Sequence, residues 1–270
     1  MKTATLKGFN YPLTPKGKST LNPSPPWYYS SDFLSVEFWS HPAAVEALLP
    51  NGLEPDPSAN GRGDAFFYDW QFSGDNEEYL DPARYQYREF FILLDALFEG
   101  KPVSYCPYIF VDNDAALARG WTQGYPKRLG QVFQTRYYAA TSKAGPALAP
   151  GSKFAGSLTA GGQLIAEAVV SLRQAVTDPS LLKQKPVINL LHVPRLAADK
   201  QDKPAIHELV QNVPREVNIE QAWIGEASLS LPVCRGEEIS DLAPVRCGRG
   251  MRASMAYIVD DLKTLKNLKN

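Results

Sequence analysis

Alternating hydrophobic and polar residues predict β-strands through the first half of the chain. The segments with this character are residues 33–38, 64–72, 85–97 and 104–112. In residues 64–72, DAFFYDWQF, the alternation places Phe67, Asp69 and Gln71 on one strand face and aromatic residues on the other. The periodicity of residues 85–97 also permits a helix, but their aromatic and β-branched content and the glycine turn that follows favour a strand.

The second half of the chain continues the β pattern. Its expected strands are residues 131–140, a hairpin of 154–160 and 163–172 about Gly161-Gly162, and residues 222–231 and 251–259, with mixed strand and loop over 183–215. Residues 141–151 are rich in small side chains and are expected to form a loop. Residues 261–270 are polar and rich in lysine, which predicts a tail.

Two short helices are expected between these strands. Ser40 is the predicted N-cap of a helix that runs through Leu49, because a proline follows near its first turn. Asn113 or Asp114 is expected to cap a second helix that runs through Arg119 and ends at Gly120.

The predicted fold class is therefore mainly β with a few short helices. The chain of 270 residues shows no repeat and no convincing interdomain linker, so residues 1–270 are expected to form one largely antiparallel β domain. Five prolines between residues 11 and 27 predict that residues 1–27 form an extended arm, a candidate for contacts between subunits.

The composition is that of an ordinary globular protein. Hydrophobic residues make up 44% of the chain, charged residues 21%, and the formal net charge is −1, which argues against disorder and against nucleic-acid partners. No run of about 18 apolar residues predicts a membrane span. The first 20 residues lack the apolar stretch of a secretory signal, so a cytoplasmic location is expected.

The cysteines and histidines predict neither disulfides nor a metal site. The three cysteines, Cys106, Cys234 and Cys247, include no C-x-x-C pair, and the three histidines have no metal-ligand spacing. No cofactor is expected.

The segment GWTQGYPKRLG, residues 120–130, places one lysine in a well-defined bend. Two glycines and a proline shape the backbone before Lys127, and its surroundings are aromatic and apolar. A free lysine of pKa about 10.4 is neutral in only roughly one molecule in 2,500 at pH 7. Burial can lower the pKa by the required 3 or so, at a cost of about 4 kcal/mol, so Lys127 is a candidate nucleophile without any metal. By itself, a Pro-Lys-Arg triplet such as residues 126–128 is more often part of a solvated turn.

The longer string YIFVDNDAALARGWTQGYPKRLG, residues 108–130, resembles the signature region of the acetoacetate decarboxylase family. In that family a Tyr-Leu-Asp-Asn-like strand end leads to a Tyr-Pro-Lys-Lys-Leu-Gly motif. Residues 87–89, Tyr-Arg-Glu, resemble its Tyr-x-Glu, and residues 207–231 resemble its late strand pair. The resemblance implies a β-barrel or double-sheet fold, a homo-oligomer, and Schiff-base chemistry on a small keto acid.

Carried over by position, the resemblance implies three catalytic residues. Lys127 matches the Schiff-base lysine, Glu89 the active-site glutamate, and Asp69 an acidic residue on the preceding strand. Independently of the resemblance, Tyr87 and Glu89 are two residues apart and share one face of a strand, while Arg88 points away.

This sequence also departs from the family pattern. The second lysine is Arg128, which is either a substrate-binding residue or a structural ion-pair partner, and whose side chain should lie opposite to that of Lys127 in extended backbone. Ser31 lies near the place of an expected arginine that would hold a substrate carboxylate. The arginines that could replace it are Arg84, Arg119 and Arg252.

Three functions remain open on this evidence. The first is decarboxylation of acetoacetate or a related β-keto acid through an iminium on Lys127. The second is suggested by Trp-Thr-Gln at residues 121–123, which resembles an aldolase-dehydratase branch acting on pyruvate and an aldehyde; there Gln123, Tyr87 and Tyr257 would hydrogen-bond the intermediates. The third is non-catalytic binding of a small carbonyl compound.

Overall fold

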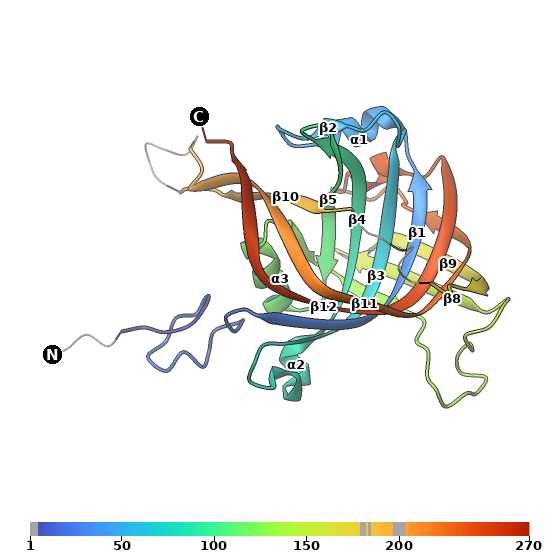
Figure 1. Cartoon of the computed structure of the whole chain (residues 1–270), viewed down its shortest axis with the longest axis horizontal. Coiled ribbons are helices and arrows are strands. Elements are labelled where there is room, and N and C mark those ends of the chain that lie inside the picture. Colours follow the sequence, from blue (N-terminus) through green and yellow to red (C-terminus); the bar gives the residue numbers. More distant parts are fainter. Residues whose placement is uncertain (1–4, 179–181, 183–184, 197–202, 270) are drawn as a thin grey trace.

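The computed structural model describes residues 5–178, 182, 185–196 and 203–269, and most of these residues form β-strands (Figure 1). The strands are β1 (Trp27–Trp39), β2 (Glu54–Pro55), β3 (Arg62–Ser73), β4 (Gln86–Phe98), β5 (Lys101–Val111), β6 (Lys127–Leu129), β7 (Gln131–Gln134), β8 (Lys153–Ala160), β9 (Gln163–Ala175), β10 (Val187–Val193), β11 (Ile206–Ser230) and β12 (Arg246–Asn267). The helices are α1 (Pro42–Leu48), α2 (Pro82–Tyr85) and α3 (Asp114–Thr122), with 3₁₀ turns at Glu78–Leu80 and Ile239–Leu242. The predicted fold class is confirmed.

The strands form one 12-stranded sheet in the order β10-β5-β4-β3-β1-β12-β11-β9-β8-β7, with β2 and β6 attached to β4 and β5. Strand β10 also pairs with β11, so the path from β10 through β5, β4, β3, β1 and β12 to β11 closes into a hydrogen-bonded ring. Most pairings are antiparallel, as expected. The pairings of β5 with β6 and with β10 are parallel, so the sheet is mixed.

The predicted tail is instead the end of the last strand. Strand β12 continues to Asn267 and pairs with β11 along this length, for example Leu262 with Asn212. Backbone pairing with a long partner strand outweighs the polar composition of residues 261–267. In contrast, the expected strand 131–140 ends at Gln134. Part of the expected mixed region, residues 183–184 and 197–202, lies outside the described residues.

Both predicted helices form, with small differences at their ends. The residue that caps α1 is His41 and not Ser40, and the His41 side chain makes no capping hydrogen bond. Asn113 caps α3, where its side chain accepts a hydrogen bond from the amide of Ala116 at 2.9 Å. Helix α3 ends at Thr122, so Gly120 lies inside the helix and does not stop it.

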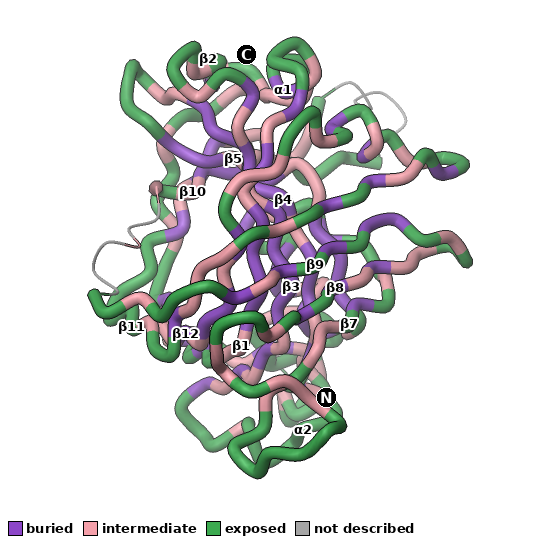
Figure 2. The backbone as a smooth tube through the Cα atoms, turned by 90° about the vertical axis from the view of Figure 1, so that its right-hand side faces the viewer, coloured by how far each residue is buried: buried purple, intermediate pink, exposed green. Residues whose placement is uncertain are grey.

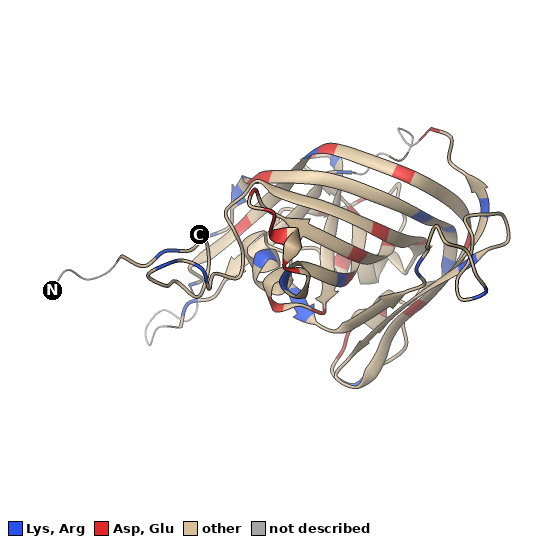
Figure 3. Ribbon diagram, turned by 90° about the horizontal axis from the view of Figure 1, so that it is seen from below, with Lys and Arg blue, Asp and Glu red and all other residues tan. Residues whose placement is uncertain are grey.

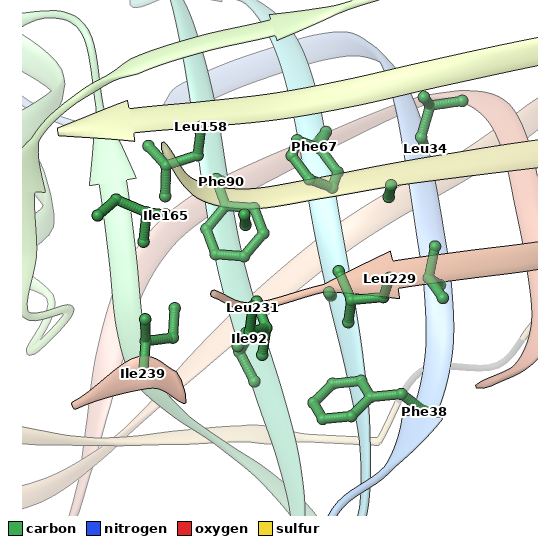
Figure 4. Close-up of a cluster of buried hydrophobic side chains, with 14 of the residues drawn as sticks. Leu34, Phe38, Phe67, Phe90, Ile92, Leu158, Ile165, Leu229, Leu231 and Ile239 are labelled. Carbon is green, nitrogen blue, oxygen red and sulfur yellow. The ribbon is translucent and has the colours of Figure 1, made fainter. Parts of the chain in front are cut away.

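The strands bury side chains on both faces, and Figure 2 shows these buried residues along the central strands. One face carries the apolar core, whose buried members include Leu34, Phe38, Phe67, Phe90, Ile92 and Leu158 (Figure 4). The opposite face carries the Tyr–Trp core, whose members include Tyr29, Tyr68, Trp70, Tyr87 and the partly buried Tyr257. The alternation predicted for residues 64–72 is confirmed, because Phe67 enters the first core while Tyr68 and Trp70 enter the second.

Charged residues of both signs are spread over the strands and loops, as the ribbon in Figure 3 shows. Among the described residues, none of the helices is long and apolar enough to cross a membrane.

Candidate active site

Lys127 is held in place by the loop that connects α3 to β6. Gly124 has φ of +76°, which reverses the chain after the helix. The indole nitrogen of Trp121 donates a hydrogen bond to the carbonyl of Lys127 at 2.9 Å, and β6 then pairs with β5, Lys127 opposite Ile109. The lysine side chain therefore leaves a fixed backbone and points to the face that carries the Tyr–Trp core.

Gly120 provides the space through which this side chain passes. A Cβ atom at position 120 would lie 2.2 Å from Cδ and 2.5 Å from Cε of Lys127, closer than any van der Waals contact allows. Helix α3 thus lies directly against the lysine stem. The sequence predicted a helix stop at this glycine, but its role is to admit Lys127.

The amine of Lys127 forms a buried ion pair with Glu89. The Nζ and Oε2 atoms are 2.5 Å apart, and the two side chains are 7% and 6% exposed. The indole nitrogen of Trp70 donates to the other carboxylate oxygen, Oε1, at 3.1 Å. Both oxygens of Glu89 are therefore engaged, which fixes the carboxylate next to the amine.

Burial lowers the pKa of Lys127 because it penalises the ammonium form. The negative charge of Glu89 raises this pKa, and the nearby positive charge of Arg119 lowers it further. The net effect is a pKa of Lys127 below its ordinary value. Burial is the largest of these causes, as the sequence led us to expect for Lys127.

Tyrosine side chains surround the pair. The amine lies 5.4 Å from the ring centre of Tyr87 and 6.0 Å from that of Tyr125. Tyr257 stacks on Tyr29 with ring centres 4.9 Å apart and meets the Trp70 ring edge-on at 5.7 Å. Of the residues expected to bind substrate, Tyr87 and Tyr257 are therefore part of this site.

Arg119 reaches the same site from α3. Its side chain is almost completely buried, 1% exposed, and Nη1 donates to Oδ1 of Asn22 at 2.8 Å. Within the described part of the chain, its Nε and Nη2 atoms have no hydrogen-bond partner. The guanidinium carbon is 5.2 Å from the ring centre of Tyr87, so Arg119 and Lys127 both approach this tyrosine.

The electrostatic surroundings keep Arg119 charged. Burial lowers its pKa, but its interactions with the phenol groups of Tyr29 and Tyr87 outweigh burial and raise the pKa. Gln123, one turn further along, is buried and donates from Nε2 to the Arg119 carbonyl at 3.2 Å. Its side chain also interacts with Tyr29, so Gln123 belongs to this site.

Two of the expected site residues lie elsewhere. Asp69 is on the opposite face of β3 from Trp70 and pairs with Arg136 at 2.9 Å. Arg128 points away from Lys127, as expected for extended backbone, and binds Glu237 through two hydrogen bonds of 2.6 and 2.7 Å. The pleat of a strand sends alternate side chains to opposite faces, which is why neither group meets the amine.

The other two candidate arginines have different partners. Arg84 approaches the carbonyl of Thr20 at 3.5 Å, and Arg252 pairs with Asp32 at 2.6 Å.

Among the described residues, no three His, Cys, Asp or Glu side chains gather as a metal ion would require.

Comparison with known proteins gives relatives along almost the entire chain. The family model described as acetoacetate decarboxylase (ADC) matches residues 10–268. The acetoacetate decarboxylase of Ralstonia nicotianae (strain ATCC BAA-1114 / GMI1000) is 25% identical over 236 residues, which cover 85% of this chain and 82% of that protein.

Solved structures also match almost the whole chain. The enduracididine biosynthesis enzyme MppR, complexed with the condensation product of pyruvate and imidazole 4-carboxaldehyde, is 32% identical with a TM-score of 0.90, and the match covers 100% of both chains. An acetoacetate decarboxylase-like enzyme from Sphingomonas wittichii RW1 has the same fold at 22% identity and a TM-score of 0.88, over 97% of this chain and 100% of that one. Because the family model matches nearly all residues, this chain belongs to the acetoacetate decarboxylase family.

Proposed function

We propose that this protein is a Schiff-base enzyme that joins pyruvate, or another small 2-keto acid, to an aldehyde. The observation that carries the proposal is the buried Lys127–Glu89 pair next to the partly unpaired guanidinium of Arg119. These groups supply an amine, a proton acceptor and a carboxylate-binding cation around one tyrosine ring.

Imine formation begins with the neutral amine of Lys127. It attacks the ketone carbon, and loss of water from the carbinolamine leaves an iminium that withdraws electrons from the adjacent carbon. Glu89, whose carboxylate lies 2.5 Å from Nζ, would remove a proton from that carbon to give the enamine. The enamine attacks the aldehyde, and water then hydrolyses the product from the lysine.

Arg119 favours reactions that keep the carboxylate. Its Nε and Nη2 atoms, which have no partner other than the phenol groups of Tyr29 and Tyr87 among the described residues, can bind both oxygens of a carboxylate, the strongest pairing available to a guanidinium. Tight binding of a carboxylate in a buried site stabilises the ground state and opposes its departure as neutral carbon dioxide. A 2-keto acid that retains its carboxylate therefore suits the site better than a β-keto acid that loses it.

The polar side chains around the pair have roles in this scheme. Tyr87, Tyr257 and Gln123 would hydrogen-bond the carbinolamine and the aldol hydroxyl. The similarity to MppR, whose structure holds a condensation product of pyruvate and an aldehyde, supports this assignment. The family itself and the Ralstonia relative support decarboxylation of acetoacetate as the second candidate.

The test is borohydride reduction of the protein with pyruvate, and separately with acetoacetate, followed by peptide mass spectrometry while carbon dioxide is monitored. We expect a reduced pyruvate adduct on Lys127 and no carbon dioxide. Lys127→Met should abolish the adduct, whereas Lys153→Met, an exposed control on β8, should not change it.

The alternatives give different results. Rapid carbon dioxide release from acetoacetate would identify a decarboxylase. Absence of an adduct with either acid would overturn the Schiff-base mechanism and favour non-catalytic binding of a carbonyl compound.

A further inference from the structure

Two asparagines are buried side by side on β10 and β11. Asn189 is fully buried and Asn212 is 9% exposed. Asn189 pairs with Val210, and Asn212 is two residues further along the same strand, so all three side chains share one face of this strand pair. That face packs against the loop that carries Lys127, because a Cβ atom at Gly124 would lie 3.1 Å from Val210 and 3.2 Å from Asn189.

The hydrogen-bonding capacity of these amides is partly unused. Apart from their interaction with the Tyr125 hydroxyl, both polar atoms of Asn189 and Oδ1 of Asn212 have no hydrogen-bond partner within the described residues. Buried polar side chains in folded proteins are nearly always paired, since an unpaired group loses its bonds to water without replacement. Two such amides at one place offer hydrogen bonds to a bound molecule.

Tyr125 connects the amides to the reactive lysine. Burial raises the pKa of its hydroxyl, and hydrogen bonding to the side chains of both asparagines acts against this change, which places them beside the phenol oxygen. The ring of the same tyrosine is 6.0 Å from Nζ of Lys127. The amides therefore meet the hydroxyl of a tyrosine whose ring is near the amine, whereas Arg119 contacts a different tyrosine, Tyr87.

We propose that Asn189 and Asn212 form a neutral subsite that recognises an uncharged hydrogen-bond donor, such as a hydroxyl group, on the part of the substrate distal to its carboxylate. Two unpaired Oδ1 atoms match a donor, and amides carry no charge that would balance an ion. The inference rests on the proposed function, because it assigns the second end of the same substrate. It predicts a hydroxylated aldehyde fragment and, for the condensed product, a hydroxylated 2-keto acid.

The test compares ligands that differ in one group. Straight-chain 2-keto acids of increasing length, each with a terminal hydroxyl, are matched with analogues that carry a methyl group in place of the hydroxyl, and dissociation constants are measured by calorimetry. For at least one length, the wild-type protein should bind the hydroxylated acid about tenfold more tightly or better, because a site built for a hydrogen bond rejects the analogue without it.

Leucine substitutions locate the effect. In Asn189→Leu and Asn212→Leu, the ratio of the dissociation constant of the methyl analogue to that of the hydroxylated acid should fall to about twofold or less. Borohydride trapping of pyruvate on Lys127 should be unchanged. Each variant should also melt close to the wild-type temperature, because an apolar side chain of similar size offsets the lost hydrogen bond to Tyr125. A purely structural role for the asparagines predicts a lower melting temperature with the ratio intact.

The outcomes separate this inference from the proposed function. A ratio near one at every length in the wild type would overturn the subsite, whether or not the variants fold. A ratio that survives both substitutions would overturn it as well. If the hydroxyl preference is found and depends on the asparagines but pyruvate forms no adduct, the subsite stands and the Schiff-base function fails.

Discussion

Strands β1, β3 and β4 bury side chains on both faces, but the two faces bury different chemistry. The apolar core consists of side chains such as Leu34, Phe67 and Ile92, which bring no strong hydrogen-bonding group (Figure 4). The Tyr–Trp core brings phenol and indole groups, and the buried Lys127–Glu89 pair lies against it.

The difference explains where a buried charge can be held. Removing an ammonium and a carboxylate from water costs several kcal/mol each unless other polar groups replace the water. On the Tyr–Trp side, Trp70 donates to Glu89, and the face of the Tyr87 ring is close to the amine. On the apolar side no such groups are available among the buried members of the core. The buried cation on that side, Arg252 opposite Leu34, is instead held by the carboxylate of Asp32 at 2.6 Å.

The largest effect is expected from Glu89→Gln, which removes the charge that the Tyr–Trp side supports. Deuterium exchange of the pyruvate methyl protons, followed by NMR, should slow by roughly 10²–10⁴-fold, because the proton acceptor is lost. The rate of imine formation rises with pH as Lys127 loses its proton. Since Glu89 raises the pKa of Lys127, the substitution should move this rise to lower pH.

Asp69→Asn is the matched control for this prediction. Asp69 is on the opposite face of β3 and pairs with the half-exposed Arg136, so neither the exchange rate nor the pH profile should change. A pH profile that moves upward in Glu89→Gln, or equal slowing in the two variants, would contradict the assignment of Glu89.

Ile92→Ala tests the other face. The side chain is fully buried in the apolar core, and its truncation should reduce the free energy of unfolding by about 2–5 kcal/mol. The folded variant should still trap pyruvate on Lys127 at the wild-type rate. Urea unfolding and borohydride trapping measure the two effects, and a trapping rate that falls along with stability would show that the cores are not separate.

Part of this division could be predicted from the sequence. Alternation in residues 64–72 separated Asp69 from Trp70, and spacing alone placed Tyr87 with Glu89 and put Arg128 opposite Lys127. Alternation does not give the register between strands, which pairs Tyr68 with Glu89. Asp69 was therefore carried over from the family resemblance onto a face that does not meet the amine.

Other features depended on contacts between distant segments. Nothing local showed that Gly120 lies against the Lys127 stem, because a glycine near a helix end usually terminates it. Of three candidate arginines, only the packing of α3 selects Arg119. The polar residues at 261–267 form a strand because β11 pairs with them, a long-range interaction that composition does not record.

Gly120→Ala should have an intermediate effect. Alanine normally stabilises a helix interior by up to about 1 kcal/mol relative to glycine, but its Cβ atom would overlap Cδ of Lys127. We expect borohydride trapping of pyruvate to slow by about tenfold or more, as displacement of the amine disturbs its alignment with the substrate. Gly145→Ala, in a loop where the new Cβ atom would meet only the Arg136 carbonyl oxygen at 3.4 Å, is the control. Normal trapping with a higher melting temperature would show that the lysine stem has room for the methyl group.

The smallest effect is expected from Arg128→Met, although Arg128 is adjacent to the reactive lysine in sequence. Its side chain is 55% exposed and pairs with Glu237, so its loss should cost less than about 1 kcal/mol and change the rate of imine formation by no more than about twofold. Arg119→Met is the informative contrast, because Arg119 lowers the pKa of Lys127. That substitution should move the pH dependence of imine formation to higher pH and weaken pyruvate binding. Equal movement of the pH profile in both variants would mean that Arg128 acts on the amine as strongly as Arg119, which lies near the same tyrosine as the amine, Tyr87. The separation of the two strand faces would then fail.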